Sequence, residues 1–250
     1  MVKVCGVTCP EDALAACRAG ASMIGVIFAE GSKRAASREQ AAAVVEAVRE
    51  FGERDGKGGG DVGGGTLVEK TAALAAACRR PQVVGVFQNQ PAALVNEIVK
   101  ECGLDFAQLH GKEGMEACGD IDVPVLRVVD IAADDSRPGA EIGEEIVKGL
   151  TDHPAAILLD ASVRGVGGGA GVSFNWDVAK YVQGCGIPVI VAGGLSGDNV
   201  EAVVKEVGPF GVDASSGVEK PGVYGVKDRG RVEEFVRRAL EAGERGREGI

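Results

Sequence analysis

The sequence predicts an α/β protein that folds as one (β/α)8 barrel, the TIM-barrel architecture. Short apolar runs of strand length alternate along the chain with segments of helical periodicity, eight of each. Runs such as VVGVF, AAILLD and PVIVAGG are apolar without alternation, which is typical of parallel strands buried on both faces. A length of 250 residues is also usual for such a barrel. We therefore assign residues 1–250 to a single barrel domain, because the alternative, an open doubly wound sheet, normally uses fewer strands.

The predicted strands are apolar and rich in β-branched residues. They lie near Lys3–Val7, Met23–Phe28, Val83–Phe87, Asp105–Leu109, Val123–Val129, Ala155–Asp160, Pro188–Ala192 and Phe210–Ala214. The first predicted helix has a proline and two acidic residues at its start and a glycine at its end. The predicted helices lie near Pro10–Ala19, Arg38–Phe51, Pro91–Glu101, Lys112–Cys118, Gly139–Leu150, Asn175–Gln183, Ser196–Val207 and Val226–Ala242.

One segment interrupts this alternation. Gly52–Thr66 (GERDGKGGGDVGGGT) is polar, glycine-rich and of low complexity, which predicts a flexible insertion within the domain. Because it lies between a helix and the following strand, we expect it at the end of the barrel away from the site.

The composition excludes several classes of function. The chain has 27 Lys and Arg against 37 Asp and Glu, a net charge of −10, which opposes binding to nucleic acid or to an anionic membrane. No run approaches the ~18 apolar residues of a membrane span. The chain opens MVKVCGVT without a signal-type segment, so we expect a cytoplasmic protein, or a plastid one whose transit peptide is absent from this chain. The seven cysteines are scattered, as expected of reduced thiols.

The chemistry of a barrel lies at the carboxyl ends of its strands, in the loops that lead into the helices. The polar residues that end or follow the predicted strands are therefore the candidates. In chain order they are Cys5, Thr8, Ser32, Lys33, Arg34, Gln88, Asn89, Gln108, His110, Arg127, Asp130, Asp160, Arg164, Gly193, Gly194, Asp213, Ser215, Ser216 and Gly217.

Two of these loops predict a phosphate site. Gly193 and Gly194 follow the seventh strand, and Ser215, Ser216 and Gly217 follow the eighth, where barrels commonly hold a phosphate. Glycine lets backbone N–H groups approach phosphate oxygens. The alternative is that these glycines form only tight turns.

Two residues are candidates for proton transfer. Asp160 ends an aliphatic run, and a carboxyl beside an apolar wall keeps its proton more readily and can act as a general acid. It can also simply cap the following turn. Cys5 ends the first strand, where a cysteine is either a nucleophile or base, or a small core residue.

The glycine-rich stretch Gly165–Gly171 formally matches a dinucleotide-binding fingerprint. That fingerprint requires an acidic residue after the next strand, and PVIVAGG has none, so no dinucleotide cofactor is predicted. Gly167, Gly168 and Gly169 instead suggest a lid that closes over a substrate, or a plain connector.

No metal site is predicted. Cys5 and Cys9 lack a second ligand pair, and the chain has two histidines only. His153 precedes a proline in a polar turn and is expected at the surface. His110 lies at the catalytic end, where it orients a substrate or bonds to a neighbouring loop.

Six segments keep a fixed order from Lys3 to about Asp228. They are VCGVTCPEDALAACRAGASMIGVIFAEGSKR, VGVFQNQ, DFAQLHGKE, ILLDAS followed by a glycine-rich loop and FNW, VIVAGGLSGDNV, and VDASSGVEKPGVYGVKD. In combination they resemble the phosphoribosylanthranilate isomerase family, whereas a single piece such as AGGL occurs in several phosphate-binding barrels.

The resemblance implies an Amadori rearrangement in tryptophan biosynthesis, from N-(5-phosphoribosyl)anthranilate to 1-(2-carboxyphenylamino)-1-deoxyribulose 5-phosphate. It implies a small phosphosugar as the partner, no cofactor and no metal. Matched motif by motif, the family's general base falls on Cys5, its general acid on Asp160 and its carboxylate-binding arginine on Arg34. The remaining matched or expected substrate contacts are Gln108, His110, Gly193, Gly194, Asp213 and Ser215–Gly217. Family members are monomers or homodimers, so either state is expected here.

Two other phosphosugar-barrel enzymes are disfavoured by the residues present. An indole-3-glycerol-phosphate synthase would need catalytic Lys and Glu residues at strand ends, but Lys3 starts a strand and no strand closes on a Lys-Glu pair. A metal-dependent epimerase would need paired His and Asp ligands, which one plausible histidine cannot provide. A third alternative is a barrel that binds a phosphorylated ligand without turning it over. The phosphate loops do not exclude it, but binding alone does not need both Cys5 and Asp160.

Overall fold

The fold is a closed barrel of parallel strands. We describe it from a computed structural model, which defines residues 1–52, 65–162 and 174–248. Within these ranges eight strands pair in sequence order, and β1 closes the barrel by pairing with β8. The strands are β1 Val2–Val4, β2 Met23–Ile27, β3 Gln82–Phe87, β4 Phe106–Leu109, β5 Val125–Ala132, β6 Ala156–Ser162, β7 Val189–Val191 and β8 Gly211–Ala214. The barrel predicted from the sequence is confirmed, with differences only at the strand ends.

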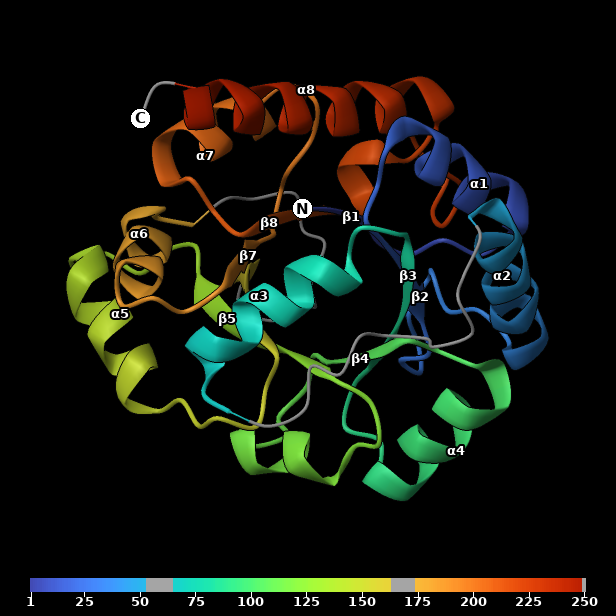
Figure 1. Cartoon of the computed structure of the whole chain (residues 1–250), viewed down its shortest axis with the longest axis horizontal. Coiled ribbons are helices and arrows are strands. Elements are labelled where there is room, and N and C mark those ends of the chain that lie inside the picture. The colour runs from blue at the N-terminus through green and yellow to red at the C-terminus, as the bar shows by residue number, and fades with distance from the viewer. Residues whose placement is uncertain (53–64, 163–173, 249–250) are drawn as a thin grey trace.

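Helices surround this barrel, as Figure 1 shows. The strands are connected by α1 Pro10–Ala19, α2 Arg38–Phe51, α4 Ala92–Cys102, α5 Gly139–Lys148, α6 Asp177–Gly184 and α7 Val200–Val207, and α8 Arg229–Glu248 follows the last strand. The ends of α1 and α2 agree with the sequence prediction. A capping box of Ser37 and Gln40 fixes the start of α2, and Gly20 in the left-handed conformation ends α1.

The helix predicted near Lys112–Cys118 is present as a 3-10 helix, η1, over Met115–Asp120, and not as an α-helix. The buried Arg127 guanidinium donates hydrogen bonds to the carbonyl oxygens of Gly111 and Glu113. These carbonyls are therefore turned toward the arginine and cannot begin an α-helical hydrogen-bond ladder.

The sequence prediction also missed one helix, α3, over Leu67–Ala77. In Figure 1 it crosses the centre of the barrel, and its Leu74 packs among side chains of the barrel interior. Lys70 donates to the carbonyls of His153 and Pro154, both 3.3 Å away, in the loop that leads into β6. Helix α3 therefore covers the amino ends of the strands, which leaves the opposite end for chemistry. Most of the predicted insertion, residues 53–64, lies outside the described residues.

The strand pleat positions the site. One core cluster fills the inside of the barrel and includes Phe106, Leu126, Val128 and Leu158. Side chains two residues apart on a strand share a face, so the same face continues into polar residues at the carboxyl ends. Past these apolar residues, toward the carboxyl ends of the strands, this inner face of the barrel carries Gln108, His110, Asp130 and Asp160.

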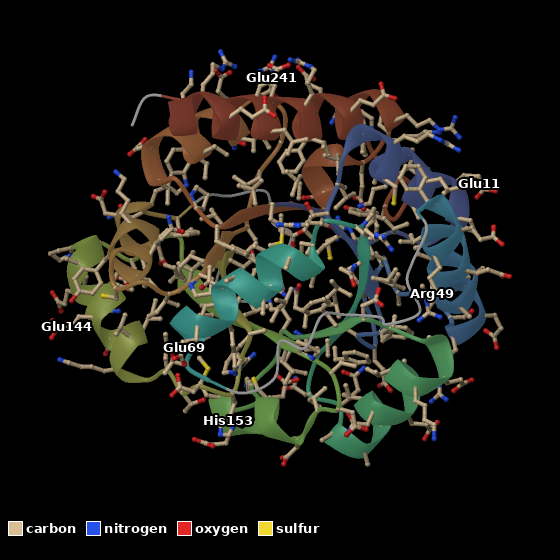
Figure 2. The ribbon with its side chains drawn as sticks, viewed as in Figure 1. Glu11, Arg49, Glu69, Glu144, His153 and Glu241 are labelled. Carbon is tan, nitrogen blue, oxygen red and sulfur yellow. The ribbon has the colours of Figure 1, made fainter. Side chains whose placement is uncertain are left out.

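The outer surface is strongly charged. Figure 2 shows Glu11, Arg49 and Glu144 at the periphery of the ring of helices, and all three are exposed.

Among the described residues, none of the helices combines the length and apolar character needed to span a bilayer.

Candidate active site

Cys5 lies just past the end of β1, in a space that β2 leaves open. Its backbone N–H donates to the carbonyl of Ala214 at 2.9 Å, which holds it against β8, and its side chain is buried. The facing residue on β2 is Gly25. A Cβ atom built on Gly25 would lie 2.7 Å from Cys5 Sγ, closer than real Cβ contacts allow. The thiol therefore occupies the volume that a side chain at position 25 would fill.

A buried ion pair lies next to this thiol. Lys3 Nζ donates to Asp213 Oδ2 at 2.8 Å, and the Lys3 side chain is fully buried. Burial lowers the pKa of Lys3, but the negative charges of Asp213 and Cys5 outweigh it and raise the pKa to about 12. Burial also raises the pKa of Cys5, and this rise outweighs the opposing charges of the Lys3 and Lys227 ammonium groups. The sequence predicted Cys5 and Asp213 but gave no direct indication of this pairing.

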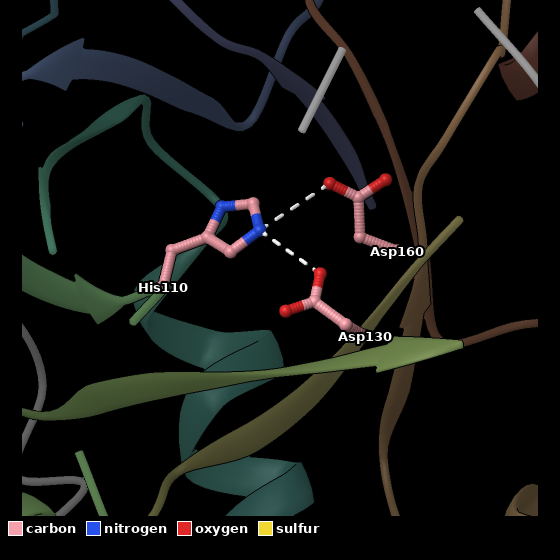
Figure 3. Close-up of side chains that lie close together, drawn as sticks. All are labelled: His110, Asp130 and Asp160. Carbon is pink, nitrogen blue, oxygen red and sulfur yellow. Dashed lines mark hydrogen bonds and ion pairs between the residues drawn. The ribbon is translucent and has the colours of Figure 1, made fainter. Parts of the chain in front are cut away.

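Asp160 projects from β6 toward His110 and Asp130, as the close-up in Figure 3 shows. His110 Nε2 lies 3.6 Å from Asp160 Oδ2 and 3.4 Å from Asp130 Oδ1. Burial raises the pKa of the Asp160 carboxyl to about 6, and the Asp213 and Asp130 charges add to the rise against the opposing charge of His110. Asp160 is therefore a carboxyl that exchanges its proton near neutral pH.

Among His110, Asp130 and Asp160, the histidine favours its charged form. Burial lowers its pKa, but the hydrogen bond to Asp130 and the charge of Asp160 outweigh burial and raise it. Ligand atoms of His110, Asp130 and Asp160 all lie within 4.8 Å of one another, close enough to surround a metal ion. When His110 is protonated, its charge pairs directly with both carboxylates. The three groups can therefore exchange protons with one another.

Gly193, predicted in a phosphate loop, also has a steric role beside Asp160. Its φ is +83°, and a Cβ atom built there would lie 2.5 Å from the backbone N of Ala161 and 2.9 Å from Asp160 Oδ1. Only glycine fits this position without displacing the carboxyl.

Arg34 is paired within the protein. Its Nε and Nη2 atoms donate to the two carboxylate oxygens of Glu219 at 2.7 and 3.0 Å. This uses one edge of the guanidinium. The other edge, with both Nη1 hydrogens and the second Nη2 hydrogen, has no acceptor among the described residues. Arg34 can thus hold a second, external carboxylate while Glu219 fixes its orientation.

Glu219 and Lys227 connect the loops after β2 and β8. Glu219 Oε1 also accepts from the Gly225 backbone N–H at 3.0 Å and from Lys227 Nζ at 3.2 Å. Burial raises the pKa of Glu219, but Arg34, Lys227 and the Gly225 N–H outweigh it and lower the pKa. Sequence reasoning did not single out Glu219 or Lys227, although both lie in the motif VEKPGVYGVKD.

The predicted phosphate loops meet at the same end of the barrel. Lys227 Nζ donates to the Ser215 carbonyl at 3.0 Å, and Asn199 Nδ2 donates to the Gly194 carbonyl at 2.9 Å. Ser216 and Gly217 begin a short 3-10 turn, Ser216–Val218. The loops are thereby fixed by side chains that the sequence analysis did not consider.

Several buried polar atoms of predicted site residues have no protein partner. They are Gln108 Oε1, Asp160 Oδ1, Asp213 Oδ1 and Ser215 Oγ, considered among the described residues. Buried polar atoms are normally paired, so such a group marks a place where a polar ligand can bind.

The other predicted positions have different outcomes. Arg127, a strand-end candidate, is structural, because its Nη1 and Nη2 atoms donate to the Leu109 and Gly111 carbonyls at 2.6 and 2.9 Å. His153 is at the surface as predicted, and pairs with Glu116 at 2.9 Å. The predicted lid residues Gly167, Gly168 and Gly169 lie outside the described residues, as does Arg164.

The fold and these side chains define a class: closed βα barrels with buried titratable groups at the carboxyl ends of the strands. The family model described as N-(5'phosphoribosyl)anthranilate (PRA) isomerase matches residues 65–238. The chain belongs to this family.

The named relatives of this chain are consistent with this family. Tryptophan biosynthesis protein TRP1 of Phytophthora nicotianae is 43% identical over 95% of this chain, which spans only 46% of that relative, about half its length. The N-(5'-phosphoribosyl)anthranilate isomerase of Geobacter sulfurreducens is 37% identical, covering 95% of this chain and 97% of the relative. That of Dehalococcoides mccartyi is 35% identical, covering 96% and 95%.

Solved structures of the family are also similar. The crystal structure of phosphoribosyl anthranilate isomerase from Thermus thermophilus has a TM-score of 0.71 at 30% identity and covers 96% of this chain and 98% of that one. A phosphoribosyl anthranilate isomerase in complex with reduced 1-(o-carboxyphenylamino)-1-deoxyribulose 5-phosphate has a TM-score of 0.69 at 25% identity, with the same coverage.

Proposed function

We propose that this chain rearranges N-(5-phosphoribosyl)anthranilate to 1-(2-carboxyphenylamino)-1-deoxyribulose 5-phosphate without a cofactor. The observation that carries the proposal is the buried Asp160, whose pKa of about 6 leaves part of the carboxyl protonated near neutral pH. The family membership and the names of the relatives support the same reaction.

Asp160 is the general acid of the first step. Its proton goes to the furanose ring oxygen, the C1′–O bond breaks, and the nitrogen lone pair forms a protonated imine at C1′. The ionised carboxylate that remains is stabilised by His110, whose Nε2 lies 3.6 Å from Asp160 Oδ2. The hydrogen bond to Asp130 raises the pKa of His110 and so favours its charged form.

Cys5 is the general base of the second step. The protonated imine withdraws electrons from the C2′–H bond, so the thiolate of Cys5 can take that proton. The resulting enolamine then tautomerises to the ketone, and the net reaction is an isomerisation. Because the imine itself accepts the electrons, no cofactor is required. The charges of Lys3 and Lys227 favour the thiolate, but burial outweighs them and keeps the pKa of Cys5 above its usual value.

The two anionic ends of the substrate have separate sites in this proposal. The free edge of Arg34 binds the anthranilate carboxylate bidentately. The backbone of Gly193, Gly194 and Ser215–Gly217 binds the phosphate, and the unpartnered Ser215 hydroxyl supports this assignment. The unpartnered oxygens of Asp213 and Gln108 are available to the sugar hydroxyls.

Location and oligomeric state remain predictions. We propose the cytoplasm, or a plastid if a transit peptide precedes this chain, and a monomer or a homodimer. One similar solved structure is described as monomers generated from a dimeric enzyme of Thermotoga maritima, at 25% identity.

The test is a fluorescence progress curve with freshly generated N-(5-phosphoribosyl)anthranilate. The signal of the anthranilate group should decay with the native protein and remain at the spontaneous rate with Cys5→Ala. Cys118→Ala, at another buried cysteine outside the site, is the matched control and should retain activity. No turnover by the native protein, combined with protection from unfolding by the substrate, would instead support a barrel that only binds.

A further inference from the structure

An exposed tyrosine lies beside the proposed carboxylate-binding arginine. The ring centroid of Tyr224 is 4.3 Å from Lys33 Nζ and 5.5 Å from Arg34 Cζ. Tyr224 is nevertheless 56% exposed, and its neighbours Val223 and Val226 are exposed as well. An aromatic ring with much of its surface free therefore borders the guanidinium whose second edge is unoccupied.

The loop that carries Tyr224 is held in place on both sides. The backbone N–H of Gly225 donates to Glu219 at 3.0 Å, and its carbonyl accepts from the Thr8 hydroxyl at 3.1 Å. The backbone of Gly225 lies against the β2 loop, since a Cβ atom built there would be 3.6 Å from the Lys33 carbonyl oxygen. The same carboxylate, Glu219, thus orients both Arg34 and the tyrosine loop.

We infer that Tyr224 is a specificity-determining residue that contacts the aromatic ring of the substrate while Arg34 binds the carboxylate of that ring. An aryl carboxylate offers an anionic group and a flat apolar ring side by side, and Arg34 and Tyr224 offer the complementary pair. This inference rests on the proposed function, and it assigns to Tyr224 selectivity for the aryl part of the substrate. Tyr224 takes no part in the proton transfers.

The test compares Tyr224→Ala with Tyr224→Phe and Lys33→Met. Direct binding of anthranilate is followed by its fluorescence, and KM and kcat are measured with N-(5-phosphoribosyl)anthranilate. An aromatic contact of ordinary strength predicts that Tyr224→Ala weakens anthranilate binding and raises KM by about five- to tenfold. Its kcat and its inhibition by inorganic phosphate should stay within about twofold of the native values, because stacking in a separate subsite touches neither. Tyr224→Phe keeps the ring and should behave as the native protein.

Two results would overturn the inference. One is unchanged anthranilate binding in Tyr224→Ala. The other is an equal loss in Lys33→Met, since the tyrosine would then act only by restraining the lysine. Binding of anthranilate does not require turnover, so it tests this subsite separately from the proposed function. A native protein that binds anthranilate through Tyr224 but leaves N-(5-phosphoribosyl)anthranilate unchanged would support the subsite and refute the proposed function. Melting temperatures equal to that of the native protein establish that the variants are folded.

Discussion

The raised pKa of Asp160 makes the stability of the barrel depend on pH. This carboxyl is 7% exposed, and its pKa rises from 3.8 to about 6 on folding. A group whose pKa is raised by folding stabilises the folded state in its protonated form, and this contribution is lost as pH rises from about 4 through 6. About two pKa units correspond to about 3 kcal/mol. Asp160→Asn removes the ionisation and keeps the shape of the side chain.

We therefore expect Asp160→Asn to be about 3 kcal/mol more stable than the native protein at pH 8, with a difference close to zero at pH 4. Urea unfolding at a series of pH values measures the free energy of unfolding of both proteins. The exposed Asp120→Asn is the control for changing a carboxylate into an amide at the surface. A difference between Asp160→Asn and the native protein that is the same at pH 4 and pH 8 would refute the raised pKa, and with it the case for a general acid.

Two further predictions concern the environment of the acid and of the base. His110→Asn removes a positive charge that lowers the pKa of Asp160, so the limb of the pH profile of kcat/KM that reports the ionisation of Asp160, expected near pH 6, should move to higher pH. His153→Asn is the matched control, and an unmoved limb in His110→Asn would show that another group titrates. Gly25→Ala places a Cβ atom 2.7 Å from Cys5 Sγ, so kcat should fall at least about tenfold while the fold loses about 1–3 kcal/mol. Native kcat in a folded Gly25→Ala protein would argue against Cys5 as the base.

The barrel could be predicted because each strand is a local pattern. A run such as AAILLD predicts a buried parallel strand. Because barrel active sites lie at the carboxyl ends of the strands, the residue that ends this run, Asp160, is then a candidate site residue. Helix α3 was missed because the glycine-rich insertion hides its start. The capping box of Thr66 and Glu69 at that start was an available signal.

The partners of the site residues could not be predicted in the same way. Arg34 and Glu219 are 185 residues apart, and only closure of the barrel brings their loops together. The sequence predicted that Arg34 binds a carboxylate, but it did not reveal that one edge of the guanidinium is already used. The pKa of Asp160 depends on its burial and on His110 and Asp130, which are tertiary properties. Cys5 was ambiguous between core and catalysis until the family motifs were considered.

The most direct test of the proposed chemistry is the deuterium isotope effect at C2′ of N-(5-phosphoribosyl)anthranilate, with the reaction followed under single-turnover conditions. Proton removal by Cys5 predicts a primary isotope effect with the native protein, and a rate at least about 100-fold lower with Cys5→Ser. The Cys118→Ser control should keep both the rate and the isotope effect of the native protein. Full turnover by Cys5→Ser, with the same isotope effect, would contradict the assignment of the base and the mechanism built on it.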